Sequence, residues 1–484
     1  MEKRDGRIKA RTCADGSTQR AYTRKEEVAS PTVLTESVLL TAAIEAKENR
    51  DVMTIDIPNA FIQTDMESTG DERVVMKVTG TLVDMLVDMA PEVYRDHVTH
   101  EGNTKVLYME VLKAIYGMLQ SSVLFYKKLK KDVQEIGFVI NPYEPCVANR
   151  VVDNRQQTIT WHVDDLKSSH VNIRVNDEFH SWLEKKYGDP NIGQVKAVRG
   201  KRHDYLAMVL DYSTKGKVKV DMTRYVRQMI EEFPEPIKPQ SCPWNENLFK
   251  ADSSSPQLSK DKCEKFHTFV AKALFLRKRA RQDIQPAIAF LTTRVKQPTQ
   301  SDWDKLKRTM GFLKKTQGDV LTPEMDDQTS IRWHLDAAFA VHPDLKSHSG
   351  AIMTLGKGCV QSVSTKQKVN VRSSTEAELV ATDDILTKVL WTKKFLEAQD
   401  IKVLENVIYR DNTSTMKLEQ NGKASSGKRT RHFDIKYFYI TDLIERKEVT
   451  IEHCPTEEMT ADYMTKPLTG SKFIKFRKRI MNLE

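Results

Sequence analysis

The chain has 484 residues, of which 76 are Lys or Arg and 67 are Asp or Glu, so its formal net charge is +9 and its pI is about 9.0. The hydrophobic fraction of 39% and the charged fraction of 30% are ordinary for a globular protein, and they exclude disordered, collagen-like and disulfide-stapled classes. At roughly 150 residues per domain, this length predicts about three domains. The basic balance favours an acidic partner, of which nucleic acid is the commonest.

No window approaches 18 consecutive apolar residues, so we expect no membrane-spanning helix and no membrane partner. The first residues are charged and no apolar stretch follows them, which predicts that the chain has no secretory signal. The six cysteines are scattered singly and show no zinc-binding spacing, so we expect free thiols in a reducing, intracellular setting.

The chain divides into three predicted blocks, 1–235, 236–325 and 326–484. Five prolines between Pro234 and Pro256 predict an extended connector at the first boundary. The middle block has helical apolar spacing over 266–295 and again over 303–315, with basic residues beside the apolar stripe. From Ile331 the period changes to two, which predicts a half-buried strand.

Three aspartates stand at the ends of two predicted strands in the first block. The range 51–57 alternates as a strand and brings Asp56 to its end, and the strand predicted over 158–163 is followed at once by Asp164 and Asp165. One interpretation is a simple hairpin, because Asp is common in tight turns. The other is that Asp56 and Asp164 meet across neighbouring strands, where oxygen ligands suit Mg²⁺ and where cations would relieve the repulsion between carboxylates.

The residues around these aspartates resemble the reverse transcriptases of copia-type retrotransposons. The stretch 56–61 (DIPNAF) is similar to the family's D-x-x-x-A-F box, 112–121 (LKAIYGMLQS) to its L-x-x-x-L-Y-G-L-K-Q box, and 162–165 (HVDD) to its Y-V-D-D box. Further similar stretches lie at 7–19 and 205–211. Together with matches in the last block, they keep the family's order over nearly the whole chain.

This resemblance implies a role for each matching residue. Asp56 and Asp164 would be the main metal ligands of a polymerase site, and Asp165 an auxiliary carboxylate. Phe61 would be a steric gate that favours dNTPs, although it could equally be a core aromatic. The remaining nucleotide-site residues would be Gln120, Tyr116 with the adjacent Gly117, and Lys9 and Arg11, the last two of which could also be solvated charges.

Two residues depart from the family pattern. His162 stands where the family usually has Tyr, and Ala207 stands where it usually has Gly. Because that Tyr ordinarily packs near the primer terminus, His162 favours a rival hypothesis in which polymerase chemistry is impaired.

Four carboxylates in the last block fall in a second ordered pattern: Asp336 on a strand, Glu378 near the start of a helix, Asp411 after a strand and Asp462 at the start of a helix. Taken singly, each is more often structural than catalytic, and Glu378 and Asp462 stand where acidic residues commonly cap helix starts. As a set, with SSTEAE at 373–378 and PTEEMTADYMTKPL at 455–468, they resemble the ribonuclease H domain of copia-type elements. The resemblance implies that all four are catalytic, with Glu378 preferred over Glu376.

Basic segments accompany these motifs. The loop that holds Lys423, Lys428, Arg429 and Arg431 is either a solvated loop or a contact to an RNA–DNA hybrid. The basic helices of the middle block suit a thumb and connection that track phosphates. The run from Lys472 to Arg479 mixes bases and aromatics, and we favour a last amphipathic helix over a nucleic-acid grip.

The resemblance implies an α+β protein with right-hand polymerase fingers and palm over 1–235, helical thumb and connection over 236–325, and a ribonuclease H-like domain over 326–484. It implies RNA- and DNA-directed DNA synthesis and hybrid cleavage with two Mg²⁺ ions per site, which Mn²⁺ can replace. The expected partners are RNA template, DNA primer, hybrid, dNTPs and other polyprotein products, and the oligomeric state stays open. We expect an intracellular, cytoplasmic location in a virus-like particle with nuclear access.

Two alternatives remain open at this point. One is a folded, non-catalytic nucleic-acid-binding relic, and the other is a chain that keeps only ribonuclease H activity. The start of the chain inside the fingers, without integrase-like motifs, is consistent with a processed product, a truncated copy or a gene-model artefact.

Overall fold

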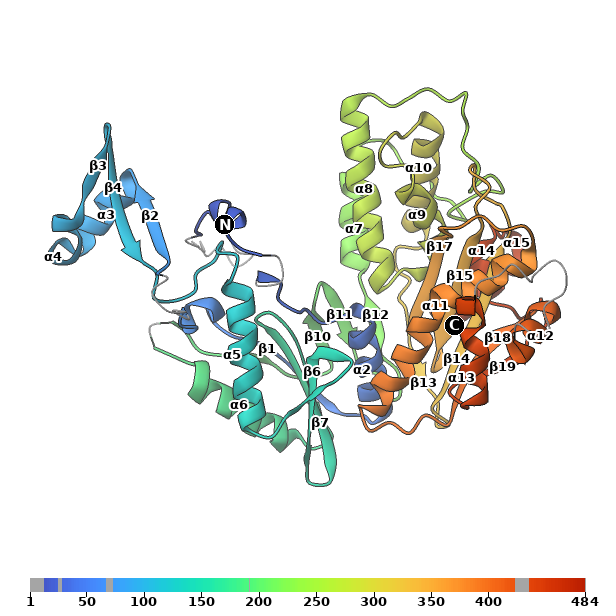
Figure 1. Ribbon diagram of the computed structural model, residues 1–484, viewed down its shortest axis with the longest axis horizontal. Helices are drawn as coiled ribbons and strands as arrows, with labels where there is room; N and C mark the ends of the chain where they lie inside the picture. The colour runs from blue at the N-terminus through green and yellow to red at the C-terminus, as the bar shows by residue number, and fades with distance from the viewer. Residues whose placement is uncertain (1–12, 25–27, 67–72, 191, 423–434, 484) are drawn as a thin grey trace.

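The computed structural model describes residues 13–24, 28–66, 73–190, 192–422 and 435–483 (Figure 1). The protein combines helices with several separate sheets, which confirms the α+β class. Within these ranges no helix is both long and apolar enough to cross a membrane. All six cysteines, which lie inside the described ranges, have free thiols, as expected.

A six-stranded antiparallel sheet forms the centre of the first half of the chain. Lys167 on its fourth strand forms a buried ion pair at 2.5 Å with Glu45 of α2 (Thr35–Lys47), and the adjacent Ser168 donates to Asn176 of α6 (Ile173–Tyr187). Because neighbouring strand residues face opposite sides, α2 and α6 cover opposite faces. The strands, in spatial order, are β5 (Val139–Asn141), β6 (Glu144–Val152), β7 (Arg155–His162), β8 (Asp165–His170), β1 (Asp51–Asp56) and β9 (Lys196–Val198).

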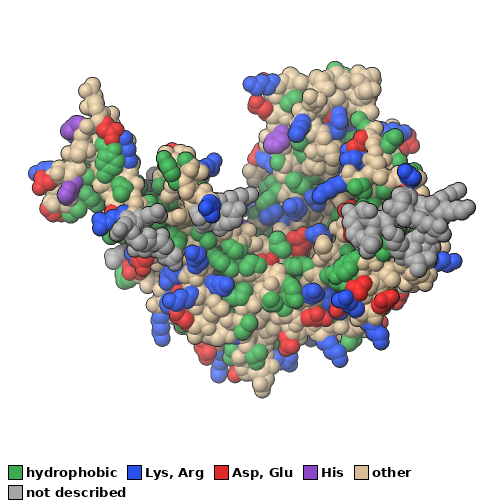
Figure 2. Space-filling view, in the orientation of Figure 1, with side chains coloured by type: hydrophobic (Ala, Val, Ile, Leu, Met, Phe, Trp, Pro, Cys, Tyr) green, Lys and Arg blue, Asp and Glu red, His purple; other side chains and the backbone are tan. Residues whose placement is uncertain are grey.

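A small three-stranded sheet projects from one side of this body, at the left of Figure 1. Its own core contains Val78, Val83 and Leu107. Figure 2 shows that the surface is hollowed between this projection and the helices at the upper right. The projection consists of β2 (Val75–Thr79), α3 (Thr81–Met89), α4 (Pro91–Tyr94), η3 (Arg95–His97), β3 (Thr99–Glu101) and β4 (Thr104–Glu110).

The middle of the chain is helical, but the helix predicted over 266–295 is broken in two. The first part, α8 (Lys260–Arg279), ends where Arg281 turns inward to form a buried ion pair with Asp283. Pro286 at the start of the second part lacks the amide that a continuous helix would need. The other elements here are β10 (Arg202–Tyr205), β11 (Met208–Asp211), β12 (Lys219–Asp221), α7 (Thr223–Glu232), η4 (Gln282–Ile284), α9 (Gln285–Thr292) and α10 (Gln300–Lys315).

The proline-rich connector between α7 and α8 has no helix or strand, as predicted, but it is a packed segment rather than a free linker. Trp244, Leu248 and Phe249 are buried. The indole Nε1 of Trp244 donates to the carbonyl of Leu468 at 2.7 Å, so this segment reaches into the last block.

A five-stranded mixed sheet forms the last block. On β15 (His348–Thr354), Ser349 donates to Asp384 of α11 (Ser374–Glu397), while a Cβ at Gly350 would meet α14 (Asp462–Thr465) at 2.5 Å. The two helices therefore cover opposite faces. The sheet order is β17 (Gln361–Lys366), β15, β14 (Ser330–Ala338), β18 (Glu405–Arg410) and β19 (Thr450–His453); outside it lie β13 (Glu324–Met325), β16 (Gly356–Lys357), α12 (Thr413–Asn421), η6 (Ile435–Phe438), α13 (Tyr439–Glu445) and α15 (Gly470–Met481).

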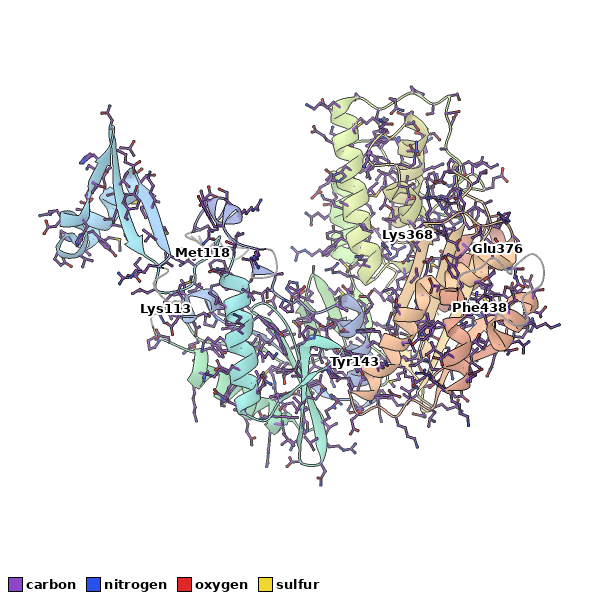
Figure 3. The ribbon with its side chains drawn as sticks, viewed as in Figure 1. Lys113, Met118, Tyr143, Lys368, Glu376 and Phe438 are labelled. Atoms are coloured by element: carbon purple, nitrogen blue, oxygen red, sulfur yellow. The ribbon has the colours of Figure 1, made fainter. Side chains whose placement is uncertain are left out.

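The two halves of the chain share one apolar core. A single cluster of buried side chains extends from Val33 to Met481. Polar contacts also join the halves: Trp391 of α11 donates to the carbonyl of Tyr143 at 2.9 Å, where the first sheet meets α11 (Figure 3). The three-block division of the chain stays a prediction, because packing crosses its boundaries.

In the turn between β10 and β11, two non-glycine residues have left-handed backbone conformations. Leu206 has φ 50° and Ala207 has φ 66°, and Tyr205 pairs with Met208 across this two-residue loop. Such tight hairpin turns favour glycine or asparagine, because a Cβ is strained at positive φ. Ala207, which departs from the family pattern, therefore carries a local conformational cost.

We predict that Ala207→Gly raises the free energy of unfolding by about 1 kcal/mol, because glycine adopts this φ without strain. Urea denaturation followed by circular dichroism measures the change. Ala197→Gly, in strand β9, is the matched control and should lower stability by about 0.5–1 kcal/mol. Equal effects of the two replacements would show that backbone strain at Ala207 is absent.

Candidate active sites

The first candidate site lies where β1 and β8 end side by side. In the antiparallel register Asp56 pairs with Asp165, and the amide of Ile57 approaches the carbonyl of Asp164 at 3.4 Å. Partial desolvation raises the pKa of Asp165, and the negative charges of Asp164 and Asp56 raise it further. The structure therefore brings together the three aspartates that the sequence analysis placed at strand ends, and their mutual repulsion favours a bound cation.

The β7–β8 turn beside these aspartates is strained. Val163, a β-branched residue, has φ 60°, a conformation that costs such residues of the order of 1–3 kcal/mol. His162 pairs with Asp165 across this turn, and its charge opposes the upward shift of the aspartate's pKa. The two interpretations of the Asp164-Asp165 pair are therefore compatible: the pair lies at a tight turn, and it also lies beside Asp56.

Two of the predicted nucleotide-site residues, Phe61 and Tyr116, lie in contact with each other. Phe61 lies in η2 (Ala60–Gln63), two residues beyond Asn59, and its ring centroid is 4.7 Å from that of Tyr116 and 6.4 Å from that of Phe125. Its side chain is only partly buried against the core. Gln120 is the residue before α5 (Ser121–Glu135). Lys9 and Arg11 lie outside the described residues.

Gly117 permits a close backbone contact that shapes this region. Its φ is 93°, and a Cβ built on it would lie 1.9 Å from the carbonyl oxygen of Ala14. The amide of Ala14 donates to the carbonyl of Tyr116 at 2.7 Å, and Gln19 accepts a hydrogen bond from the amide of Leu119. Residues 14–19 are thereby fixed against the segment that carries Tyr116 and leads to Gln120.

We predict that Gly117→Ala lowers the free energy of unfolding by at least about 2 kcal/mol and detaches residues 14–19, because it adds a backbone overlap to the cost of positive φ. Gly137→Ala is the matched control: its φ is 91°, but nothing lies within 4 Å of the added Cβ, so about 1 kcal/mol is expected. Denaturation and limited proteolysis of the N-terminal segment distinguish them. Equal losses in both variants would contradict the close-contact explanation.

The second candidate site lies on the mixed sheet. Asp336 of β14, Glu378 of α11 and Asp411 after β18 each offer a carboxylate oxygen, and these oxygens lie within 4.8 Å of one another. Asp336 and Glu378 are buried and Asp411 is half-buried. Burial raises the pKa of Glu378 well above its usual range, and it also raises that of Asp336. This all-oxygen donor set fits a hard divalent cation such as Mg²⁺.

The two glutamates at the start of α11 have different environments. Ser373 caps the helix by accepting from the amide of Glu376, whose carboxylate reaches back to the amide of Arg372 at 2.6 Å. Figure 3 labels Glu376 at this end of the helix. Glu378 instead points toward Asp336 and Asp411. Glu376 therefore fulfils the capping role that the sequence allowed for either residue.

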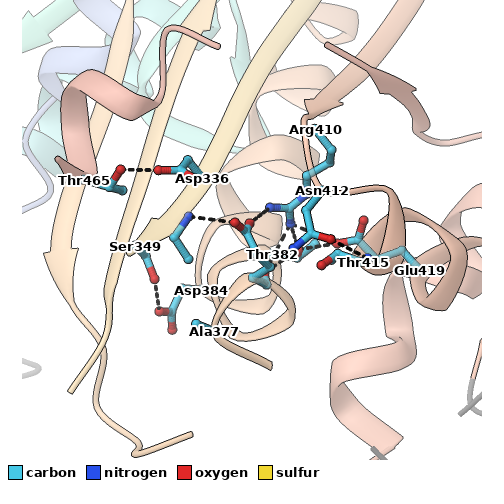
Figure 4. A network of polar contacts seen from close by, with 12 residues as sticks. Asp336, Ser349, Ala377, Thr382, Asp384, Arg410, Asn412, Thr415, Glu419 and Thr465 are labelled. Atoms are coloured by element: carbon cyan, nitrogen blue, oxygen red, sulfur yellow. Dashed lines mark hydrogen bonds and ion pairs between the residues drawn. The ribbon is translucent and has the colours of Figure 1, made fainter. Parts of the chain in front are cut away.

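Asp462 reaches the same region from α14, but with lysines as its partners. Lys466 contacts Asp462 at 2.5 Å and Asp336 at 3.4 Å, and Lys472 contacts Asp462 at 3.1 Å. The hydroxyl of Thr465 donates to Asp336 (Figure 4). These ion pairs raise the pKa of Lys466 despite its burial, so its ammonium compensates part of the charge of the carboxylates.

Two functional candidates were missed by sequence reasoning. Arg410, the last residue of β18, forms ion pairs with Glu378 at 2.6 Å and with Glu419 of α12 at 2.9 Å (Figure 4). Arg410 and Glu419 are fully buried. For Arg410, the only signal in the sequence was its position directly after the apolar residues of a predicted strand.

The basic loop with Lys423, Lys428, Arg429 and Arg431 lies outside the described residues. The helix predicted near the C-terminus is confirmed as α15, which buries Phe473 and Phe476. Its Arg477 bonds to Asp283 at 2.9 Å, so at least one of the basic residues there serves packing between elements.

The comparisons with known proteins agree with the expected resemblance to copia-type retrotransposons. Residues 1–235 match the family model described as reverse transcriptase (RNA-dependent DNA polymerase). The chain is 23% identical to a retrovirus-related Pol polyprotein from transposon TNT 1-94 of Nicotiana tabacum, 26% to that from transposon RE1 of Arabidopsis thaliana and 23% to a transposon Ty1 Gag-Pol polyprotein of Saccharomyces cerevisiae. These matches cover 97–98% of this chain but only 34%, 30% and 26% of the relatives.

A foamy viral protease–reverse transcriptase, solved in complex with double-stranded DNA, is similar in structure with a TM-score of 0.48 and 12% identity. The similarity covers 84% of this chain and 57% of that one. The sequence matches confirm the expected resemblance: residues 1–235 match the reverse transcriptase family model, and the chain as a whole is similar to the Pol polyproteins of Ty1/copia-type transposons.

Proposed function

We propose that this chain is an RNA- and DNA-directed DNA polymerase that also cleaves the RNA of RNA–DNA hybrids. The observation that carries the proposal is the presence of two separate carboxylate clusters, one in the reverse transcriptase segment and one on the mixed sheet. The proposed divisions are fingers and palm over 1–235, thumb and connection over 236–325, and a ribonuclease H-like domain over 326–484, together in a right-hand polymerase.

Asp56, Asp164 and Asp165 are the proposed metal ligands of the polymerase site, and Asp336, Glu378, Asp411 and Asp462 those of the nuclease site. Two Mg²⁺ or Mn²⁺ ions at each site would supply the Lewis acidity for phosphoryl transfer. In the polymerase site, Phe61 excludes a ribose 2′-hydroxyl while Tyr116 and Gln120 line the nucleotide pocket, with Lys9 and Arg11 toward the triphosphate or template. In the nuclease site, Thr465 orients Asp336 by a hydrogen bond.

A groove between α8, β17 and α11 supports nucleic-acid binding. It has a volume of about 250 Å³, and its lining includes Arg277, Lys278 and Lys388. The Nε of Arg277 is buried and has no hydrogen-bond partner within the described ranges. We propose that the backbone of the template–primer duplex contacts this groove, and that the loop with Lys423, Lys428, Arg429 and Arg431 contacts the hybrid.

The relic hypothesis remains the second candidate, and His162 is the observation that favours it. Against it, all seven candidate carboxylates are present, and six of them lie in the two clusters while Asp462 adjoins Asp336 through Lys466. As for other retrotransposon Pol proteins, we propose an intracellular site of action, with the remaining polyprotein products as partners.

The proposal is tested by Mg²⁺-dependent extension of a DNA primer on an end-labelled RNA template, which reports synthesis and cleavage together. Asp164→Asn should reduce extension at least about 100-fold and spare cleavage, whereas Asp411→Asn should do the reverse, because each change removes a ligand from one cluster only. Cleavage without extension by the unmodified chain would favour ribonuclease H activity alone. The absence of both activities from folded protein would favour the relic.

Phe61→Ala should raise the incorporation of ribonucleotides at least about tenfold relative to dNTPs, because it opens the space beside Tyr116 that a 2′-hydroxyl needs. Single-nucleotide extension with dNTP and rNTP pairs measures the ratio. Phe61→Tyr keeps the ring and should retain discrimination. If the alanine variant discriminates as well as the unmodified chain, the residue is a core aromatic and not a gate.

A further inference from the structure

Arg410 and Glu419 form a charged pair directly behind the second carboxylate cluster. The guanidinium of Arg410 lies between α11 and α12, with Nη1 on Glu378 Oε2 at 2.6 Å and Nη2 on Glu419 Oε1 at 2.9 Å (Figure 4). Nη2 also lies 3.2 Å from the backbone carbonyl of Glu378 and contacts the hydroxyl of Thr382. The arginine thus holds both the side chain and the backbone of Glu378.

The carboxylate of Glu378 is fixed from two directions. Its Oε1 accepts a hydrogen bond from the amide of Ala337 on β14 at 3.2 Å, while its Oε2 accepts from Arg410. A carboxylate has about four lone-pair positions, so two contacts leave acceptor capacity. Since a Glu378 oxygen lies within 4.8 Å of oxygens of Asp336 and Asp411, that remaining capacity is available to a shared cation.

Charge balance explains the presence of Glu419. An arginine bound to Glu378 alone would cancel the negative charge that a cation needs. Glu419 is fully buried, and its one described ion pair is with Arg410, so the group of Glu378, Arg410 and Glu419 would carry a net charge of −1 when all three side chains are ionised. Burial raises the pKa of both glutamates, and a bound cation would favour their ionised forms. The compensating charge is therefore inside the protein, where salt screens it little.

Stability alone does not account for this arrangement. Arg410 Nε and Glu419 Oε2 are both buried without a hydrogen-bond partner in the described structure. Buried ion pairs are often no more stabilising than apolar residues of similar volume, and unsatisfied polar atoms add a cost. A costly pair in direct contact with a candidate metal ligand points to a role at that ligand.

We propose that Arg410 and Glu419 are positioning residues for Glu378: Arg410 fixes the carboxylate, and Glu419 neutralises Arg410 so that Glu378 keeps its charge for a divalent cation. This inference rests on the proposed hybrid-cleaving site. It assigns the two effects to different measurements, because lost charge weakens cation binding whereas lost positioning lowers turnover at saturating cation.

Glu419→Gln keeps the shape of the side chain but leaves Arg410 uncompensated. It should raise the Mg²⁺ concentration at half-maximal hybrid cleavage about tenfold and weaken Mn²⁺ binding, measured by calorimetry, by a similar factor. Glu419→Asp retains the charge and should restore both values to within about threefold of the unmodified chain. Glu448→Gln, which removes a carboxylate paired with Lys393 at 2.5 Å, is the matched control and should change neither value.

The double variant Arg410→Met/Glu419→Leu removes both charges. Its Mg²⁺ midpoint should return toward that of the unmodified chain, while turnover at saturating Mg²⁺ falls about tenfold because Glu378 is no longer held. Unchanged Mg²⁺ and Mn²⁺ midpoints in folded Glu419→Gln would overturn the inference even if the double variant does not fold. If the unmodified chain binds Mn²⁺ but cleaves no hybrid, the proposed function fails, and the Mn²⁺ midpoints still decide the role of the pair.

Discussion

Carboxylates gathered in one place repel one another unless a proton or a positive charge accompanies them, and this constraint applies to both candidate sites. On the mixed sheet, Lys466 and Arg410 approach the carboxylates from opposite sides, one at the rim and one from the interior. At the ends of β1 and β8, Asp165 pairs with Asp56 in register and feels the charges of both neighbouring aspartates.

Two glycines allow close packing near the candidate sites. Gly350 pairs with Asp336 across β14 and β15, and the absence of its side chain lets α14 approach the sheet. Gly117 plays a comparable part for residues 14–19. In both places a backbone atom or side chain occupies the volume that a Cβ would need, so glycine is required for packing and not only for chain flexibility.

Much of the framework could be predicted from the sequence because it depends on local patterns. The sequence patterns of β1, β7, β14 and β18 place Asp56, Asp164, Asp336 and Asp411 on or just after strands, and the cap at Ser373 explains why Glu376 faces away from the cluster. Pro286 is a local signal that a helix over 266–295 is interrupted, but the buried ion pair of Arg281 and Asp283 at the break could not be predicted, because it forms only in the tertiary structure. The same holds for the contact of Arg410 with Glu378, which lies on α11, 32 residues earlier in the chain.

Because the two halves share one core, substitutions that accumulate without selection would affect both proposed activities. Side chains from Val33 to Met481 pack into one cluster, and α11 touches the first half through Tyr143. A substitution that loosens this core lowers the folded population on which both proposed activities depend, wherever it falls. Random drift would therefore remove the two proposed activities together, whereas the loss of one alone would point to a lesion at its own reacting groups.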